Sequence, residues 1–343
     1  MSKLSNRGSR WIPVFGVLLF ITFVFSLKLG AISITWSEIQ TSLSKWLTDG
    51  DLNLTERIFF QIRLPRALAG VLVGASLAVA GVLMQALFRN PIVEPGLIGT
   101  SSGAAFGASL YFVLGAVIKV HFGEWTLPLA ACFGGTISTV CVFLLAQNRS
   151  TGKSSIVTLL LVGLAINALF LSGVGFLSYL ARDPQARSIT FWNLGTLSGA
   201  NWVSVSIIGA VTIVCTFVAM RYAKQLNALM MGEEEAVLLG VNLKRLQIII
   251  IAINVLLVAV STAFMGIISF VGLVVPHLLR LMNGSDNRFL IIGSALAGGI
   301  LLSLADLVSR LLLAPAELPI GIVTSLVGVP VFITLLRKRQ YFF

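Results

Sequence analysis

Charged residues are scarce in this sequence. They make up 11% of its 343 residues, whereas 57% are hydrophobic and the mean hydropathy is +0.97. Soluble domains are about 25% charged, and a soluble core of this size could not hide so much apolar surface. The composition therefore excludes a soluble globular domain and predicts an all-α polytopic membrane protein, forming a single transmembrane domain over residues 1–343.

Residues that bind metals or form disulfides are also few. The three cysteines, Cys132, Cys141 and Cys215, lie inside apolar runs without paired spacing, which is typical of packing residues. The two histidines, His121 and His277, are too scattered for a ligand cluster. We therefore expect neither a metal site nor a cofactor.

Catalytic motifs are missing as well. The sequence has no Walker P-loop, no nucleophile elbow and no paired acid and base within one segment. We therefore predict that the chain is not an enzyme. If it works in an ATP-driven process, the ATPase must be another polypeptide.

Long apolar runs, in contrast, fill the sequence. A spanning helix needs about 20 apolar residues. The candidate spans are 11–31, 66–86, 96–116, 126–146, 155–179, 202–220, 246–268, 270–282, 289–312 and 318–336. The count is nine or ten, with about ten preferred, because the eighth run is short enough to be a partial or broken helix. No small-residue cleavage pattern follows the first run, so we expect a retained helix rather than a signal peptide.

The basic residues predict the orientation of these spans. Of the 24 Lys and Arg residues, 15 fall on the side of the N-terminus and nine on the other side. The positive-inside rule then places both termini in the cytoplasm. The net charge of +11 is dispersed around helix ends rather than gathered in a stripe, so we expect a membrane and not nucleic acid as the partner.

A charged segment at 221–245 interrupts the apolar runs and is predicted to be cytoplasmic. Its centre reads Met231, Gly232, Glu233, Glu234, Glu235, Ala236, Val237, Leu238, Leu239, Gly240. Apolar positions alternating with charges predict small amphipathic helices, and Gly240 is placed to end one as a C-cap. Such a segment is either a plain connector or a docking surface for a soluble partner.

Polar residues inside the spans are few. Asp306 and Arg310 are one turn apart and can neutralise each other, which avoids a penalty of about 3 kcal/mol for each lone charge. Gln85, Asn167 and the run that contains Ser101 and Ser102 either face a pathway or link helices.

Small residues recur four apart and predict close helix packing. Examples are Gly70 with Gly74 and Ser294 with Gly298. The runs 66–179 and 246–336 each hold four apolar segments with an early proline break, and they enter the membrane from opposite sides. This arrangement indicates an inverted repeat of two four-helix blocks, a design found in transporters.

Several long motifs, from about residue 57 to 338, resemble one family. They are Gln61–Arg66, Gly81–Pro91, Glu94–Ala104, Gly232–Ala236 with Leu239–Gly240, Gly266–His277 and Ala316–Gly321. In order and in their polar and proline positions, they resemble the membrane-spanning permease subunit of type II ABC importers for iron–siderophore complexes, haem and cobalamin.

The resemblance implies a ten-helix subunit that pairs with a second copy or a paralogue in the bacterial cytoplasmic membrane. Two cytoplasmic ATPases and an extracytoplasmic substrate-binding protein would complete the importer. The resemblance makes the segment around Met231–Gly240 the ATPase-coupling loop. It also implies that Arg63, Arg66 and Arg310 dock the binding protein through its acidic residues.

The cargo is less sharply indicated. The motifs around Glu94–Gly103 and Ala316–Pro319 look most like those of haem and cobalamin importers, with siderophore importers close behind. We expect an iron complex, with haem slightly preferred and cobalamin as the alternative. A function of another class, an ion-coupled secondary transporter, would need intramembrane ionisable relays, for which Asp306 is the clear candidate.

Overall fold

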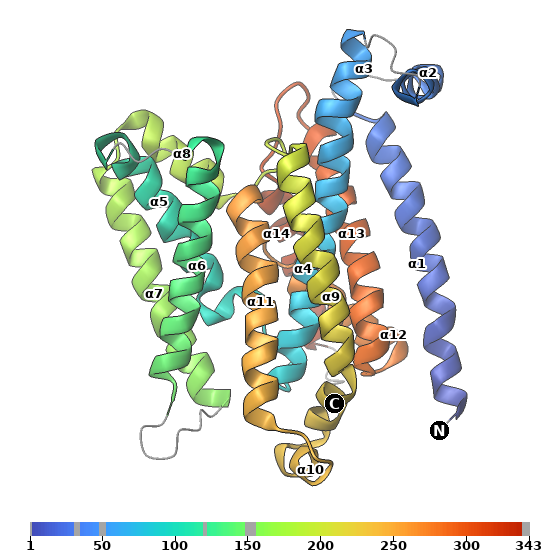
Figure 1. Ribbon diagram of the computed structural model, residues 1–343, viewed down its shortest axis with the longest axis vertical. Coiled ribbons are helices and arrows are strands. Elements are labelled where there is room, and N and C mark those ends of the chain that lie inside the picture. Colours follow the sequence, from blue (N-terminus) through green and yellow to red (C-terminus); the bar gives the residue numbers. More distant parts are fainter. Residues whose placement is uncertain (1, 31–34, 48–52, 119–121, 148–155, 338–343) are drawn as a thin grey trace.

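The computed structural model describes residues 2–30, 35–47, 53–118, 122–147 and 156–337, and Figure 1 shows these residues as a bundle of helices. Its α-helices are α1 Ser2–Lys28, α2 Trp36–Leu47, α3 Leu54–Ile58, α4 Leu64–Leu87, α5 Thr100–Ile118, α6 Thr126–Leu145, α7 Ile156–Leu180, α8 Asp183–Asn193, α9 Trp202–Met231, α10 Glu233–Leu238, α11 Leu243–Met265, α12 Val271–Asn283, α13 Asn287–Leu311 and α14 Ile320–Arg337. A π-helical turn, η1 Phe59–Arg63, joins α3 to α4, and short 3₁₀ turns are η2 Pro95–Ile98 and η3 Gly123–Trp125.

The all-α membrane fold is confirmed. Each of the ten predicted spans corresponds to one helix: α1, α4, α5, α6, α7, α9, α11, α12, α13 and α14. Within the described residues, seven helical stretches are long and apolar enough to cross a membrane, and α12 is a shorter apolar helix, as predicted. The segments 31–34 and 148–155, which include the predicted ends at residues 31 and 155 and the basic residues Arg149 and Lys153, lie outside the described residues.

Helix α9 is longer than the sequence predicted. The expected span ended at 220, but the helix continues through Arg221 and Lys224 to Met231. Charge alone does not stop a helix, and the residues of this stretch include the strong helix formers Ala, Leu, Met, Lys and Gln. Half of the predicted loop is therefore a rigid extension of a membrane helix.

The two ends of the bundle can be followed in Figure 1. Helices α3 and α8 lie at one end, called here the α3 end, and α10 lies at the other, the α10 end, together with the start of α1. Helix α4 runs from the α3 end and α11 from the α10 end, so the two blocks begin in opposite directions, as the inverted-repeat prediction requires.

Helix α4 lies at the centre of the bundle. Most residues of α4 are buried inside the chain, whereas most of the apolar residues of α1 and α7 are not. It packs on α13, α9, α11 and α12, whereas α5, α6 and α7 form a group of their own beside it (Figure 1). The exposed apolar faces of α1 and α7 suit contact with lipid or with another membrane subunit.

Glycines let α4 approach its neighbours closely. A Cβ at Gly74 would lie 2.2 Å from the carbonyl oxygen of Gly298, and a Cβ at Gly81 only 1.8 Å from that of Gly272. Small residues are favoured at such contacts because no hydrophobic effect draws helices together in lipid. The close packing predicted for Gly74 and Gly298 is confirmed.

The second predicted break does not lie at its proline, because Pro276 is inside α12; the irregular backbone lies at residues 266–270 instead. This segment and the first break, around Pro95, meet inside the bundle. Pro95, at the start of η2, packs on Gly272 near the start of α12. The Phe270 N–H, at a left-handed φ of 69°, donates to Glu94 Oε1 at 3.4 Å. Asn254 of α11 donates to the Pro95 carbonyl oxygen at 3.1 Å. Each block thus supplies a hydrogen-bond partner to a backbone group in the irregular segment of the other block. Irregular backbone inside a membrane needs such partners because lipid offers none.

The glycine contacts predict unequal effects of one added methyl group. Gly81→Ala should destabilise the protein by about 1–3 kcal/mol or more, because the new Cβ meets backbone that cannot rotate away. Gly175→Ala in α7 is the matched control, since nothing lies within 4 Å of its Cβ position. Thermal unfolding of both variants in the same detergent tests this, and equal unfolding temperatures would contradict it.

Candidate functional site

The tip of the α10 end is shaped by two glycines. Gly232 joins α9 to α10 at φ 146° and ψ 156°, and its missing Cβ leaves room for the Glu235 carboxylate. Gly240 follows α10 at φ 82°. Its N–H donates to the Val237 carbonyl at 2.9 Å, and the Val241 N–H donates to the Ala236 carbonyl at 2.9 Å. This pair of bonds is a Schellman motif, so the predicted C-cap at Gly240 is confirmed.

Helix α10 presents apolar side chains outward. Ala236 is fully buried against the chain, but Leu238 is 87% exposed and Leu239 64% exposed. Met231 and Val237 are exposed beside them. Soluble surfaces rarely hold large apolar groups together at a protruding tip without a partner. The tip therefore has the shape and chemistry of a docking surface, while the three glutamates in its first turn suit the positive end of the helix dipole.

Contacts at the base of the tip fix its position. Glu233 lies 3.6 Å from the Arg89 guanidinium at the end of α4. Asn227 of α9 accepts hydrogen bonds from the N–H and the Nδ2 of Asn287, both at 2.8 Å, and donates to Asp286 at 2.8 Å. The tip is thus tied to α4 and to the turn between α12 and α13.

A buried charge cluster occupies the α3 end. Arg66 of α4 donates to Asp306 of α13 at 2.9 Å and to Glu317, in the loop before α14, at 2.8 Å. Arg310 lies 3.0 Å from Asp306, so the predicted pairing of these two residues is confirmed. Sequence reasoning missed the contacts of Arg66 with Asp306 and Glu317. These residues follow Arg66 by 240 and 251 positions, and no local sequence pattern connects residues so far apart.

Arg310 and a third arginine, Arg63 in the π-helical turn η1, also bind the end of α1. Arg63 donates to the carbonyl oxygens of Leu27 at 3.1 Å and Lys28 at 2.9 Å, and Arg310 donates to Leu29 at 3.1 Å. The last carbonyls of a helix have no partner within the helix and carry partial negative charge. The guanidinium groups therefore cap α1 and hold it against α4 and α13.

The cluster keeps its arginines out of bulk solvent. Arg63, Arg66 and Arg310 are only 6–7% exposed, whereas the Glu317 side chain is 37% exposed. Arg66 and Arg310 face the carboxylates of Asp306 and Glu317, whereas Arg63 binds carbonyl oxygens, so these five side chains carry one net positive charge. The cluster that contains the predicted docking arginines is therefore electropositive, with Glu317 as its most accessible member.

The candidate pathway residues make contacts between helices. The Gln85 amide nitrogen of α4 donates to the Leu273 carbonyl of α12 at 3.1 Å. Ser102 donates to the Asn167 Oδ1 at 2.5 Å, and the Asn167 Nδ2 donates to the Leu97 carbonyl at 2.9 Å. Ser101 is partly exposed and lies against Gly96. Of the two interpretations of Gln85, Ser102 and Asn167, these bonds favour the linking of helices.

The structure also shows a half-buried acid that sequence reasoning did not single out. Glu94 lies in the break before η2, with its carboxylate at the start of α12. A helix start is a favourable place for a carboxylate, because of the free N–H groups and the dipole. The signal in the sequence was an acid between two prolines at Pro91 and Pro95.

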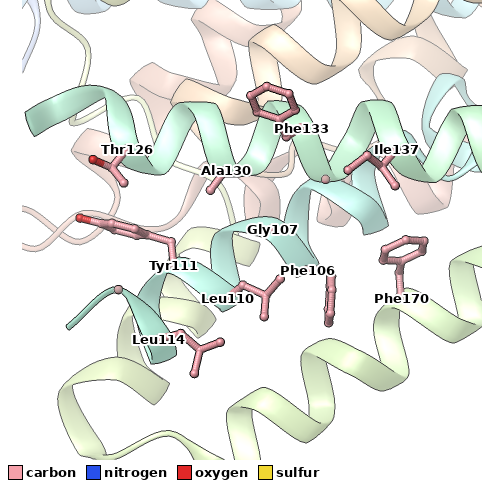
Figure 2. Close-up of a pocket in the computed structure, with 12 residues that line it drawn as sticks. Phe106, Gly107, Leu110, Tyr111, Leu114, Thr126, Ala130, Phe133, Ile137 and Phe170 are labelled. Atoms are coloured by element: carbon pink, nitrogen blue, oxygen red, sulfur yellow. The ribbon is translucent and has the colours of Figure 1, made fainter. Parts of the chain in front are cut away.

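An apolar cavity of about 380 Å³ lies between α5, α6 and α7. Figure 2 shows the aromatic rings of Phe106, Tyr111, Phe133 and Phe170 around it. Its lining carries no charged side chain. Among the described residues, no three His, Cys, Asp or Glu side chains gather in a way that could hold a metal ion. The cavity therefore offers mainly apolar and aromatic contacts, with the hydroxyl groups of Tyr111 and Thr126 as polar side-chain groups in its lining.

Comparisons with known proteins cover nearly the whole chain. The FecCD transport family matches residues 18–338. The hemin transport system permease protein HmuU of Yersinia pestis is 38% identical over 328 residues, covering 94% of each chain. The vitamin B12 import system permease protein BtuC of Shigella boydii is also 38% identical, over 336 residues, covering 98% of this chain and 97% of BtuC.

A solved structure agrees with these relatives. It is an inward-facing conformation of a transporter assigned to the metal-chelate type of ABC transporter, with a TM-score of 0.83 and 32% sequence identity, and the match covers 96% of this chain and 99% of that one. The resemblance stated from the motifs is therefore confirmed. The chain belongs to the FecCD transport family and is a multi-pass permease subunit of an ABC importer.

Proposed function

We propose that this permease moves an iron complex, with haem preferred over a ferric siderophore, across the bacterial cytoplasmic membrane. Both termini and α10 face the cytoplasm, and the chain pairs with a second copy or a close paralogue. The observation that carries the ATP-driven mechanism is the α10 tip, an exposed apolar surface that directly follows α9. Cobalamin is the alternative cargo, since the HmuU and BtuC relatives are equally similar to this chain.

The tip suits a cytoplasmic ATPase because it can transmit movement. It continues α9 without a flexible loop, and Glu233 contacts Arg89 of α4. Leu238 and Leu239 supply the apolar centre of an interface, and the glutamates supply a charged rim. A movement of the tip would thus act directly on the two membrane helices α9 and α4.

Energy supply gives the first functional prediction. The purified chain in lipid vesicles should hydrolyse no ATP, because it lacks a P-loop. Adding the ATP-binding subunit and a loaded binding protein should give ATP-dependent uptake without any ion gradient. Uptake by the chain alone, driven by a proton or sodium gradient, would instead support a secondary transporter. The pairing of Asp306 with two arginines argues against such a relay.

The exposed leucines of the α10 tip give the second functional prediction. Leu238→Ser with Leu239→Ser should reduce co-purification of the ATPase at least about tenfold, because the buried apolar centre of an interface carries most of its affinity. Leu54→Ser is the matched control, since Leu54 is 76% exposed at the opposite end. Both variants should keep the wild-type unfolding temperature. Normal ATPase retention by the double variant would exclude this docking surface.

At the α3 end we propose that the arginine cluster receives the binding protein. Arg63, Arg66 and Arg310 are already paired within the chain, so docking has to exchange one of these bonds. Glu317 is the partner most readily exchanged, because its side chain is the most exposed of the cluster. A carboxylate of the binding protein would then replace that of Glu317 on Arg66. Such exchange suits a partner that must dock and leave in each cycle.

Glu317→Gln tests this exchange. Removing the competing negative charge should raise the affinity for the loaded binding protein on the order of threefold at low salt, with a smaller gain at high salt. Glu38→Gln in α2, another acid toward the α3 end, is the control and should change nothing. Unchanged or weaker capture by a well-folded Glu317→Gln variant would count against the exchange.

Competition between candidate cargoes for uptake tests which one the permease transports. Uptake by the complete importer should be inhibited by haem first, then by ferric siderophores, and least by cobalamin. Of the candidate pathway residues, Gln85, Ser102 and Asn167 bond to neighbouring segments, which leaves the partly exposed Ser101 as the best placed to meet a cargo. Preferential inhibition by cobalamin would reverse the order of the two proposals.

A further inference from the structure

A polar cavity lies beside the base of α10, between the ends of α9 and α11. Its volume is about 450 Å³. The lining comes from two helices and the turn between them: Arg221, Tyr222, Gln225, Gly240, Asn242 and Arg245. The cavity of Figure 2, in contrast, is lined mainly by apolar side chains. This second cavity is therefore built for a polar ligand.

The lining of this cavity carries two positive charges and no acidic side chain. Within the described residues, neither Arg221 nor Arg245 has a carboxylate at ion-pair distance. Two acids at this end already have partners, since Glu233 contacts Arg89 and Asp286 contacts Asn227. Helix α11 also begins at the cavity, so the positive end of its dipole adds to the two guanidinium groups. An anion is the ligand that this field favours.

The cavity lies at the polar edge of the lipid-facing surface. Arg221 is one turn beyond Phe217, and its guanidinium sits over the Phe217 ring at 4.9 Å. Phe217 and its neighbours Ile213 and Val214 are 60–66% exposed, and Ile248 of α11 is exposed as well. Arginine at such a boundary places its aliphatic part along apolar surface and its charge at the level of the lipid head groups.

We infer that this cavity binds the phosphate group of an anionic membrane phospholipid. Arg221 and Arg245 would hold the phosphate from two helices, because a guanidinium donates paired hydrogen bonds to phosphate oxygens. Tyr222, Gln225 and Asn242 can donate further bonds to the phosphate or to a glycerol head group. The acyl chains would follow the exposed apolar residues around Phe217 and Ile248. A soluble phosphate would use the arginines but not this apolar surface.

Such a lipid would fix the height of the docking tip. Met231 lies ten residues beyond Arg221 in one continuous helix, which corresponds to about 15 Å. A phospholipid bridging α9 and α11 at Arg221 and Arg245 would therefore clamp both helices that carry α10. The inference concerns binding alone and holds for any cargo.

Phosphatidylglycerol binding to the purified full chain tests the inference. The chain is titrated in uncharged detergent, and bound lipid is counted by native mass spectrometry. Phosphatidylcholine is the comparison, because its phosphate is balanced by a positive head group. We expect preference for phosphatidylglycerol and a loss on the order of thirtyfold in affinity for Arg221→Gln with Arg245→Gln.

A matched pair of lysines controls for general charge. Lys224→Gln with Lys244→Gln removes the same charge from the same helices, but neither residue lines the cavity. This pair should keep most of the affinity. Because Arg221 and Arg245 are exposed, their variant should also keep the wild-type unfolding temperature in detergent.

Three outcomes would overturn the inference. The first is wild-type affinity for phosphatidylglycerol in the arginine variant, or an equal loss in the lysine variant. The second is displacement of the lipid by millimolar inorganic phosphate, which would identify a soluble anion as the ligand. The third is an arginine variant that binds the lipid normally but no longer retains the ATPase, which would make the cavity part of the ATPase interface. Lipid binding is measured without ATPase or cargo, so it stands or falls separately from the transport function.

Discussion

Close backbone contact around α4 is the constraint on which the rest of this structure depends. In lipid, helices gain no hydrophobic driving force by meeting, so they must approach closely enough for van der Waals contact. Gly74 and Gly81 provide that approach to Gly298 of α13 and Gly272 of α12. The irregular backbone around Pro95 and at residues 266–270 is stable because this packing shields it from lipid.

The same helix carries a charged group near each end. Arg66 joins the carboxylates of α13 and the α13–α14 loop at one end, and Arg89 faces Glu233 of α10 at the other. Arg66 lies near the start of α4, and Arg89 lies just after its last residue, Leu87; the 24 residues of this helix extend about 36 Å. One rigid, buried helix thus contacts both surfaces at which we place partners. This continuity gives the permease a direct mechanical link between its two ends.

Local signals in the sequence predicted much of this structure. The ten spans follow from the length that a membrane imposes, Gly240 from the rule for helix C-caps, and the Asp306–Arg310 pair from spacing along one helix face. The contacts of Arg66 and the meeting of Glu94 with α12 join distant segments, so periodicity carried no trace of them. The basic cavity was missed for the same reason, because its two arginines come from different helices.

The short helix α12 has a consequence for how the chain is made. Its 13 residues extend about 20 Å, less than the roughly 30 Å hydrocarbon core. A segment this short does not insert independently as a spanning helix, and its start is covered by Pro95 and Glu94, which are synthesised much earlier. The first block must therefore be in the membrane before α12 can be accommodated. The order of synthesis along the chain is also the order in which its parts can assemble.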